Sequence, residues 1–143
     1  MIRLEVPSLF DYRDLAMRMI ASACKLAEAR RREPASLKRR KDGHFTAEVM
    51  SAFGEAFNNV VLHSYGEAGG NLKIEIDVTN DALTIRVMDY GKTFDFAAVP
   101  KPNLDELPES GLGLFIIHSC MDEVTYVPGS PNVLSMTKYI GRP

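Results

Sequence analysis

The sequence is poor in the features that mark disulfide-rich, membrane-spanning and nucleic-acid-binding proteins. Its 143 residues include only two cysteines, Cys24 and Cys120, which exclude a disulfide framework; we interpret both as small reduced core residues rather than a redox pair. No apolar run approaches the length needed to span a bilayer, and residues 1–5 lack a signal-peptide layout. A formal net charge of -2 gives no reason to expect nucleic acid or a membrane as a partner. We therefore expect a cytoplasmic protein.

What the chain does contain is the composition of an ordinary globular domain. Hydrophobic residues make up 45% of it and charged residues 25%, close to the average for soluble proteins. A chain of this length is typical of one domain and is long enough to bury a substantial core. We expect a single domain over residues 1–143.

Hydrophobic periodicity predicts strands and helices in separate blocks. The alternating segments at 71–78 and 83–89 flank a short turn and predict an antiparallel hairpin. Ser8 and Thr46 are the expected N-caps of the first two helices. The expected elements are a strand at 3–6, a helix at 8–32, a helix at 45–65, the hairpin, a helix at 113–121, and strands at 123–127 and 133–140. This order predicts an α+β fold, a two-layer α/β sandwich with a mixed, mostly antiparallel sheet and helices on one face.

Two segments outside the strands bear on function. The first predicted helix has a face at helical spacing made of Leu15, Met19, Ser22, Leu26 and Ala29. It is followed by six basic residues between Arg31 and Lys41, which we interpret as a solvated loop and helix end; the alternative is a patch for an acidic protein surface or RNA. Residues 91–110 contain three prolines and no regular pattern. Because long structureless stretches in compact domains are usually functional, we expect a lid at about 95–112.

The first of three motifs lies in the second predicted helix, at 55–65. Glu55, Asn59 and His63 are four residues apart, which places them on one helix face. Magnesium needs only one or two protein oxygens, so the Asn59 side chain suits it, and Glu55 is suited to accept the proton of an attacking hydroxyl or water. Taken alone, this pattern is also explained by an amphipathic helix with polar residues toward solvent, and His63 by a structural role.

The second and third motifs supply groups for a base and for phosphates. Asp89 ends an apolar strand, where its carboxylate is placed to accept from an exocyclic amine, and Gly91 lets a ring approach the backbone; the alternative is a plain turn. Gly111 and Gly113 precede a helix and offer free backbone amides to an anion; the alternative is a tight turn into a buried helix. The third motif lacks the spacing and the Lys-Ser/Thr of a P-loop, which excludes a Walker-type site.

In this order, the three motifs resemble those of a known family. From its first helix onward the chain is similar to the gyrase/chaperone/histidine-kinase/MutL-type (GHKL) ATPases, and within them to the anti-sigma-factor serine kinases of bacteria. It matches their E-x-x-x-N-x-x-x-H-x-Y, D-x-G-x-x-F-D and G-x-G-L boxes. The matching residues are Glu55, Asn59, His63 and Tyr65, then Asp89, Gly91, Phe94 and Asp95, then Gly111, Gly113 and Leu114, followed by Met-Asp-Glu-Val at 121–124.

The resemblance implies a Bergerat-type ATP-binding fold that uses ATP and Mg²⁺ and is usually homodimeric. Members phosphorylate a serine or threonine of an anti-sigma antagonist of the STAS type, and many also hold a sigma factor inactive. The implied roles are general base for Glu55, magnesium ligand for Asn59, adenine pocket for Asp89 and Gly91, and phosphate-facing lid for Gly111 and Gly113. The resemblance also places against the nucleotide His63, Phe94, Leu112 and Leu114.

The chain departs from the family pattern at two points. Thr93 stands where sensor kinases have a further glycine, which favours the anti-sigma branch. The short lid has Lys101 as its only cation, so Lys101, Lys92 or a residue from elsewhere must supply the positive charge that phosphoryl transfer needs beyond the metal. We interpret the chain as a protein serine/threonine kinase that also switches partners. The alternatives are a non-catalytic, nucleotide-dependent anti-sigma module and an ATPase subdomain of a larger machine.

Overall fold

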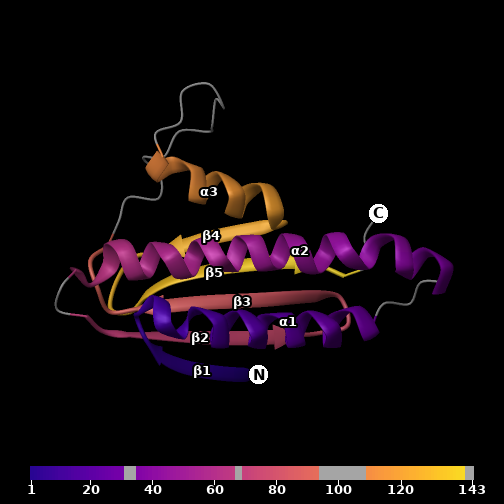
Figure 1. Ribbon diagram of the computed structural model, residues 1–143, viewed down its shortest axis with the longest axis horizontal. Coiled ribbons are helices and arrows are strands. Elements are labelled where there is room, and N and C mark those ends of the chain that lie inside the picture. Colours follow the sequence, from indigo (N-terminus) through magenta and orange to yellow (C-terminus); the bar gives the residue numbers. More distant parts are fainter. Residues whose placement is uncertain (31–34, 67–68, 94–108, 141–143) are drawn as a thin grey trace.

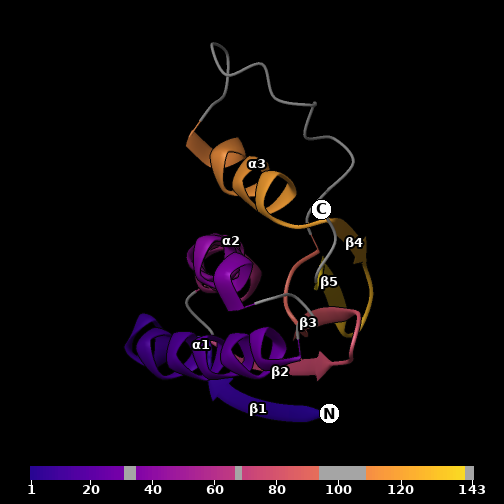
Figure 2. The same ribbon diagram turned by 90° about the vertical axis from the view of Figure 1, so that its right-hand side faces the viewer.

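The computed structural model describes residues 1–30, 35–66, 69–93 and 109–140, without the side chains of 35–43 and 109–110. Helices form one layer and a five-stranded sheet the other (Figure 1), and the view along the layers separates them (Figure 2). The helical elements are η1 (Phe10–Tyr12), α1 (Arg13–Ala29), α2 (Ala35–Asn59), the π-helical turn η2 (Val60–Ser64) and α3 (Glu109–Cys120). The strands are β1 (Ile2–Pro7), β2 (Asn71–Val78), β3 (Ala82–Asp89), β4 (Glu123–Val127) and β5 (Asn132–Tyr139). The predicted α+β sandwich with helices on one face is confirmed.

The sheet has the order β1-β2-β3-β5-β4. It is built from two hairpins, β2–β3 and β4–β5, joined side by side along β3 and β5, with β1 added at one edge. For this reason every pair of described strands is antiparallel, whereas the sequence predicts a mixed sheet. Along β2 and β3 alternate residues such as Ile74, Ile76 and Ile85 are fully buried against the helices, as the period of two requires.

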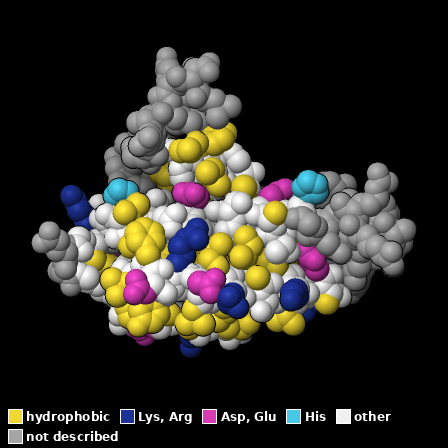
Figure 3. All heavy atoms as spheres, viewed as in Figure 1, with side chains coloured by type: hydrophobic (Ala, Val, Ile, Leu, Met, Phe, Trp, Pro, Cys, Tyr) yellow, Lys and Arg dark blue, Asp and Glu magenta, His cyan; other side chains and the backbone are white. Residues whose placement is uncertain are grey.

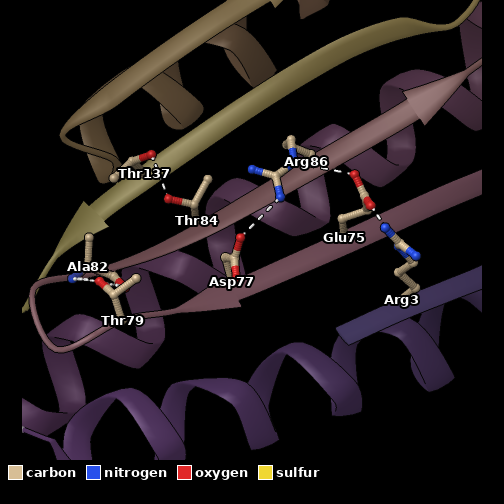
Figure 4. A network of polar contacts seen from close by, with 8 residues as sticks. All are labelled: Arg3, Glu75, Asp77, Thr79, Ala82, Thr84, Arg86 and Thr137. Carbon is tan, nitrogen blue, oxygen red and sulfur yellow. Dashed lines mark hydrogen bonds and ion pairs between the residues drawn. The ribbon is translucent and has the colours of Figure 1, made fainter. Parts of the chain in front are cut away.

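The face of the sheet turned away from the helices is polar at its centre (Figure 4). Arg3 donates to Glu75 at 2.9 Å, and Arg86 donates to Glu75 and to Asp77, each at 3.4 Å. The hydrogen bond from Arg3 is the largest cause that holds the pKa of Glu75 below its usual value, and Arg86 adds to it. Exposed pairs of this kind contribute little stability. The core, and with it the candidate site, lies on the other face.

Helix α1 begins later than predicted and buries a different face. Pro7 is still paired in the sheet and the Ser8 N–H donates to the Gly70 carbonyl at 2.8 Å, so the chain stays extended and Ser8 caps no helix. Leu15 and Leu26 are 54% and 50% exposed, which contradicts the face predicted from the larger apolar residues. The face that is buried consists of Ala16, Ile20, Ala23, Cys24 and Ala27. Small side chains let the helix approach the sheet closely. The spacing of the large apolar residues therefore does not predict which face of α1 is buried.

The other two helices, in contrast, start before their predicted positions. Helix α2 begins at Ala35, ten residues ahead of the expected Phe45. Thr46 is therefore mid-helix, and its hydroxyl donates to Glu28 of α1 at 2.9 Å instead of capping. Helix α3 begins at Glu109, so Gly111 and Gly113 lie within its first turns rather than before it.

Lys138 ties β5 to both α2 and α3. Its side chain is 13% exposed, and its Nζ donates to Glu48 Oε2 at 2.5 Å and to the Cys120 carbonyl, the last of α3, at 2.6 Å. We expect Lys138→Met to lower the free energy of unfolding by about 1 kcal/mol, since a charged donor of two part-buried hydrogen bonds is lost. Urea unfolding measures this, with exposed Lys25→Met as the control; equal midpoints for the two variants would contradict it.

Candidate nucleotide-binding site

A cavity of about 220 Å³ lies where the end of α2 meets the sheet and α3. It is bounded by two helices and by β3, β4 and β5, so residues far apart in the sequence share it. The lining residues are Ala56, Asn59, Val60, His63, Ser64, Val87, Asp89, Leu114, Tyr126 and Leu134. The volume lies below the ~300–1,000 Å³ of sites that hold whole drug-sized ligands. It suits a planar base, with the rest of a nucleotide extending beyond it.

The end of α2 supplies most of the polar groups of the cavity. Here the helix changes to the π-helical turn η2 at Val60–Ser64, and such turns are frequent at functional sites. Asn59 is the last α-helical residue, while His63 and Ser64 belong to the wider turn. The structure thus brings Asn59 and His63 to one cavity, as the four-residue spacing predicts, although the regular helix ends between them.

Asp89 provides the one carboxylate in the cavity lining. It ends β3, is 5% exposed, and its Oδ1 accepts from the Gly91 N–H at 2.9 Å and from Asn132 Nδ2 at 3.1 Å. Within the described residues its second oxygen, Oδ2, has no hydrogen bond. A buried carboxylate with one oxygen fixed and the other free is suited to accept from an amine on a bound base.

Asn132 is a functional residue that the sequence interpretation did not single out. Its side chain is fully buried and makes four hydrogen bonds: it donates to Asp89 and to the Gly91 carbonyl, and accepts from Thr93 at 2.8 Å and from the Gly129 N–H at 3.0 Å. The only signal in the sequence is an asparagine at the start of a buried strand after a turn. Asn132 therefore orients Asp89 and joins the loop after β3 to the turn before β5.

We expect Asn132→Ala to weaken nucleotide binding about tenfold and to lower the free energy of unfolding by about 2 kcal/mol. The substitution frees the Asp89 carboxylate to rotate and leaves several buried groups without a partner. Calorimetric titration with ATP and urea unfolding measure the two effects. Ser135→Ala, on the opposite face of the same strand, is the control; unchanged affinity in Asn132→Ala would contradict the orienting role.

The loop after β3 is held against the end of η2. A Cβ on Gly91 would lie 2.2 Å from the Ser64 carbonyl oxygen, which also accepts the Lys92 N–H at 2.5 Å. Gly91 therefore permits this close approach and lies beside the cavity rather than in its lining. Tyr65 fixes the same region, since its hydroxyl donates to the Asn71 carbonyl and accepts from the Tyr90 N–H, both at 2.7 Å. Desolvation is the largest cause that raises the pKa of Tyr65.

Glu55 lies outside the cavity lining, on the side of α2 that faces the backbone of α3. A Cβ on Gly113 would lie 2.9 Å from Glu55 Oε2 and 3.6 Å from Asn59 Oδ1, so a side chain there would fill the space that these two oxygens border. The Asn59 amide oxygen is of the kind that Mg²⁺ prefers, and the Glu55 carboxylate beside it is suited to accept a proton. Among the described residues Glu55 makes no hydrogen bond or ion pair.

The remaining predicted residues divide into three groups. Leu114 is buried and lines the cavity, while Gly111 is buried in the first turn of α3 and Leu112 is largely exposed. Phe94 and most of the predicted lid, including Lys101, lie outside the described residues. Cys24 and Cys120 are free thiols, the first buried and the second partly buried.

The described residues contain no group of three His, Cys, Asp or Glu side chains placed to hold a metal ion. Within the same part of the chain, no helix has the length and apolarity needed to cross a membrane.

The two-layer sandwich and the cavity at the end of its central helix define the class: an ATP-binding α/β sandwich. Residues 12–138 match the family model of the histidine kinase-like ATPase domain, and the chain belongs to this family. The family to which the three motifs point is thereby confirmed.

Relatives and solved structures agree with this assignment. The chain is 39% identical over 103 residues to the serine-protein kinase RsbW of Staphylococcus aureus, in strains bovine RF122 / ET3-1 and MRSA252, and the match covers 65% of this chain and 65% of RsbW. The histidine kinase AdeS of Acinetobacter baumannii has the same fold, with a TM-score of 0.55 at 13% identity over 99% of this chain and 70% of that one. The similarity to RsbW supports the serine-kinase branch.

Proposed function

We propose that the protein is a Mg²⁺- and ATP-dependent protein serine/threonine kinase. The observation that carries the proposal is the position of Glu55. Its carboxylate is unpaired within the described residues, and Glu55 Oε2 and Asn59 Oδ1 border the same space beside Gly113. A free carboxylate beside a metal-ligand oxygen, next to a cavity for a base, meets the needs of phosphoryl transfer to a hydroxyl. The similarity to a serine-protein kinase supports the same activity.

Each residue then has a role that follows from its place. Asp89 Oδ2 accepts the exocyclic amine of adenine while Asn132 and Gly91 hold Oδ1. The free backbone amides of the first turn of α3, which includes Gly111, face the phosphates, where the helix N-terminus favours negative charge. Asn59 holds Mg²⁺, which when bound neutralises charge on the phosphates. Glu55 accepts the proton of the attacking hydroxyl.

The proposed acceptor is a serine or threonine of a STAS-domain anti-sigma antagonist, and the protein is proposed to act as a homodimer that also binds a sigma factor. The second candidate is a nucleotide-dependent anti-sigma module without useful catalysis. It is favoured by one observation: apart from Lys92 the described residues supply no lysine beside the cavity, and Lys92 is exposed, with its backbone rather than its ammonium group bound to Ser64.

Incubation with γ-labelled ATP, Mg²⁺ and a STAS-domain antagonist from the same organism tests the proposal. We expect label on a serine or threonine of the antagonist and no transfer when EDTA removes Mg²⁺. ATP binding measured in parallel separates the two candidates. Binding of ATP and antagonist without any transfer would favour the non-catalytic module, and absence of ATP binding would overturn both.

A further inference from the structure

A second concave region lies on the outer side of α2, and Glu55 belongs to it. This region, which we call the α2 groove, has a volume of about 490 Å³. Its floor is α2, and its walls are α1 and α3, which flank α2 in Figure 1. The lining residues are Arg13, Met17, Met50, Ser51, Glu55, Ile116 and Cys120. Glu55 therefore stands between the nucleotide cavity and an open surface.

The centre of the α2 groove is apolar and adaptable. Met17 from α1, Met50 from α2 and Ile116 from α3 are each partly exposed there. Methionine is unbranched and polarizable and is over-used at surfaces that bind protein partners. Ser51 on the floor is exposed and adds little bulk. Hydrophobic side chains with acidic and basic ones among them cover this face of the molecule (Figure 3).

Arg13 gives the groove a positive charge at one wall. Its Nε donates to the Asn58 side chain at 2.9 Å, and Nη2 lies 2.6 Å from where a Cβ on Gly54 would be. The guanidinium thus lies directly on the α2 backbone because residue 54 is glycine. Its hydrogen-bond partner is a neutral amide, and within the described residues Arg13 forms no ion pair. Its charge remains available for a carboxylate from another molecule.

We propose that the α2 groove is the docking site of the phosphoacceptor protein. The segment that it fits carries the acceptor hydroxyl, an apolar side chain for the methionines and an acidic side chain for Arg13. Docking there brings the hydroxyl to Glu55 from the groove while the nucleotide occupies the cavity on the other side of that carboxylate. The hydroxyl proton moves to the Glu55 carboxylate, and the hydroxyl oxygen of the acceptor bonds to the γ-phosphorus of ATP. The bond from this phosphorus to the β,γ-bridging oxygen breaks, and ADP leaves. This inference rests on the proposed kinase function and names its acceptor surface.

The matched substitutions Ser51→Trp and Ser22→Trp test the proposal. Both serines are exposed on helices, but only Ser51 lines the groove. With the STAS-domain antagonist as the probe, we expect Ser51→Trp to reduce transfer at least tenfold and to leave ATP affinity and Tm unchanged, whereas Ser22→Trp behaves as the unmodified protein. Equal transfer by the two variants would overturn the groove and leave the kinase proposal standing. Loss of ATP binding in Ser51→Trp would also overturn it, and no transfer by the unmodified protein would overturn both proposals.

Gly54→Ala provides a second test, in which antagonist affinity should fall although the protein is not destabilised. The new methyl group displaces the Arg13 guanidinium, while alanine in a helix interior is favoured over glycine. We expect Tm to rise or stay equal, ATP affinity to stay equal, and antagonist affinity to fall about fivefold. Calorimetric titration with the antagonist measures that affinity. Unchanged antagonist affinity in Gly54→Ala would remove the role of Arg13.

Discussion

Asp89→Asn is expected to weaken ATP binding about 100-fold, or roughly 2.7 kcal/mol. Oδ1 already accepts from Gly91 and Asn132, so the amide of an asparagine must keep its oxygen there to avoid opposing two donors. Its NH₂ group then takes the place of Oδ2 and meets the amine of adenine donor to donor. One charge-assisted hydrogen bond is lost, and the amine of adenine and the new NH₂ group are both left without an acceptor.

Calorimetric titration of Asp89→Asn with ATP measures the effect. Asp77→Asn, an exposed carboxylate on the open face of the sheet, is the matched control and should bind ATP as the unmodified protein does. The NH₂ group of Asn at residue 89 can donate to a base that has a carbonyl in place of the amine, as in ITP. The ratio of ATP affinity to ITP affinity should therefore be smaller in Asp89→Asn than in the unmodified protein. Asp89→Asn with unchanged affinity would place the base outside the cavity.

The fold could be predicted from the sequence wherever the spacing of the hydrophobic residues alone decides the secondary structure. The alternation in β2 and β3 locates both strands within one residue. The short turn between them gives the antiparallel pairing, and a one-residue slip would move Ile74 and Ile85 off the buried face. The buried face of α1 could not be predicted in this way. The buried face of α1 depends on how closely the helix approaches the sheet. A close approach favours the small Ala16 and Ala23 at the contact over the larger Leu15.

Residues of the candidate site could be predicted from the sequence where a single helix or the end of a single strand fixes their position. Asn59 and His63 share a turn of chain, and Asp89 ends a strand whose limits are clear, so their common cavity follows from local structure. Asn132 could not be found this way, because its function depends on a contact between β3 and β5 across 43 residues of sequence. The separation of Glu55 from the cavity likewise depends on where α3 packs.

That separation gives Glu55 and Asp89 different expected phenotypes. Both belong to the family motifs, and both are acids near the proposed nucleotide site. Asp89 lies in the cavity lining and should set affinity, whereas Glu55 lies in the lining of the α2 groove and should set the rate of transfer. A loss of affinity and a loss of rate are separate measurements, so the two placements are tested independently.

Glu55→Gln is expected to reduce phosphoryl transfer to the antagonist by about 1,000-fold, because a positioned general base contributes roughly 10²–10⁴-fold. Glutamine keeps the size and polarity of the side chain but cannot take the hydroxyl proton. ATP affinity should change by less than about threefold, because Glu55 lines the groove and not the cavity. The free energy of unfolding should change by less than about 0.5 kcal/mol, since among the described residues the carboxylate has no partner to lose.

Single-turnover transfer from γ-labelled ATP, with ATP affinity measured on the same samples, separates these effects. Glu48→Gln is the matched control on α2: it weakens the contact with Lys138 and so lowers stability, but it should leave the transfer rate unchanged. Wild-type transfer by Glu55→Gln would show that the carboxylate is not the base. An equal loss of affinity and rate would place Glu55 in nucleotide binding, and the α2 groove would then no longer open onto the reacting hydroxyl.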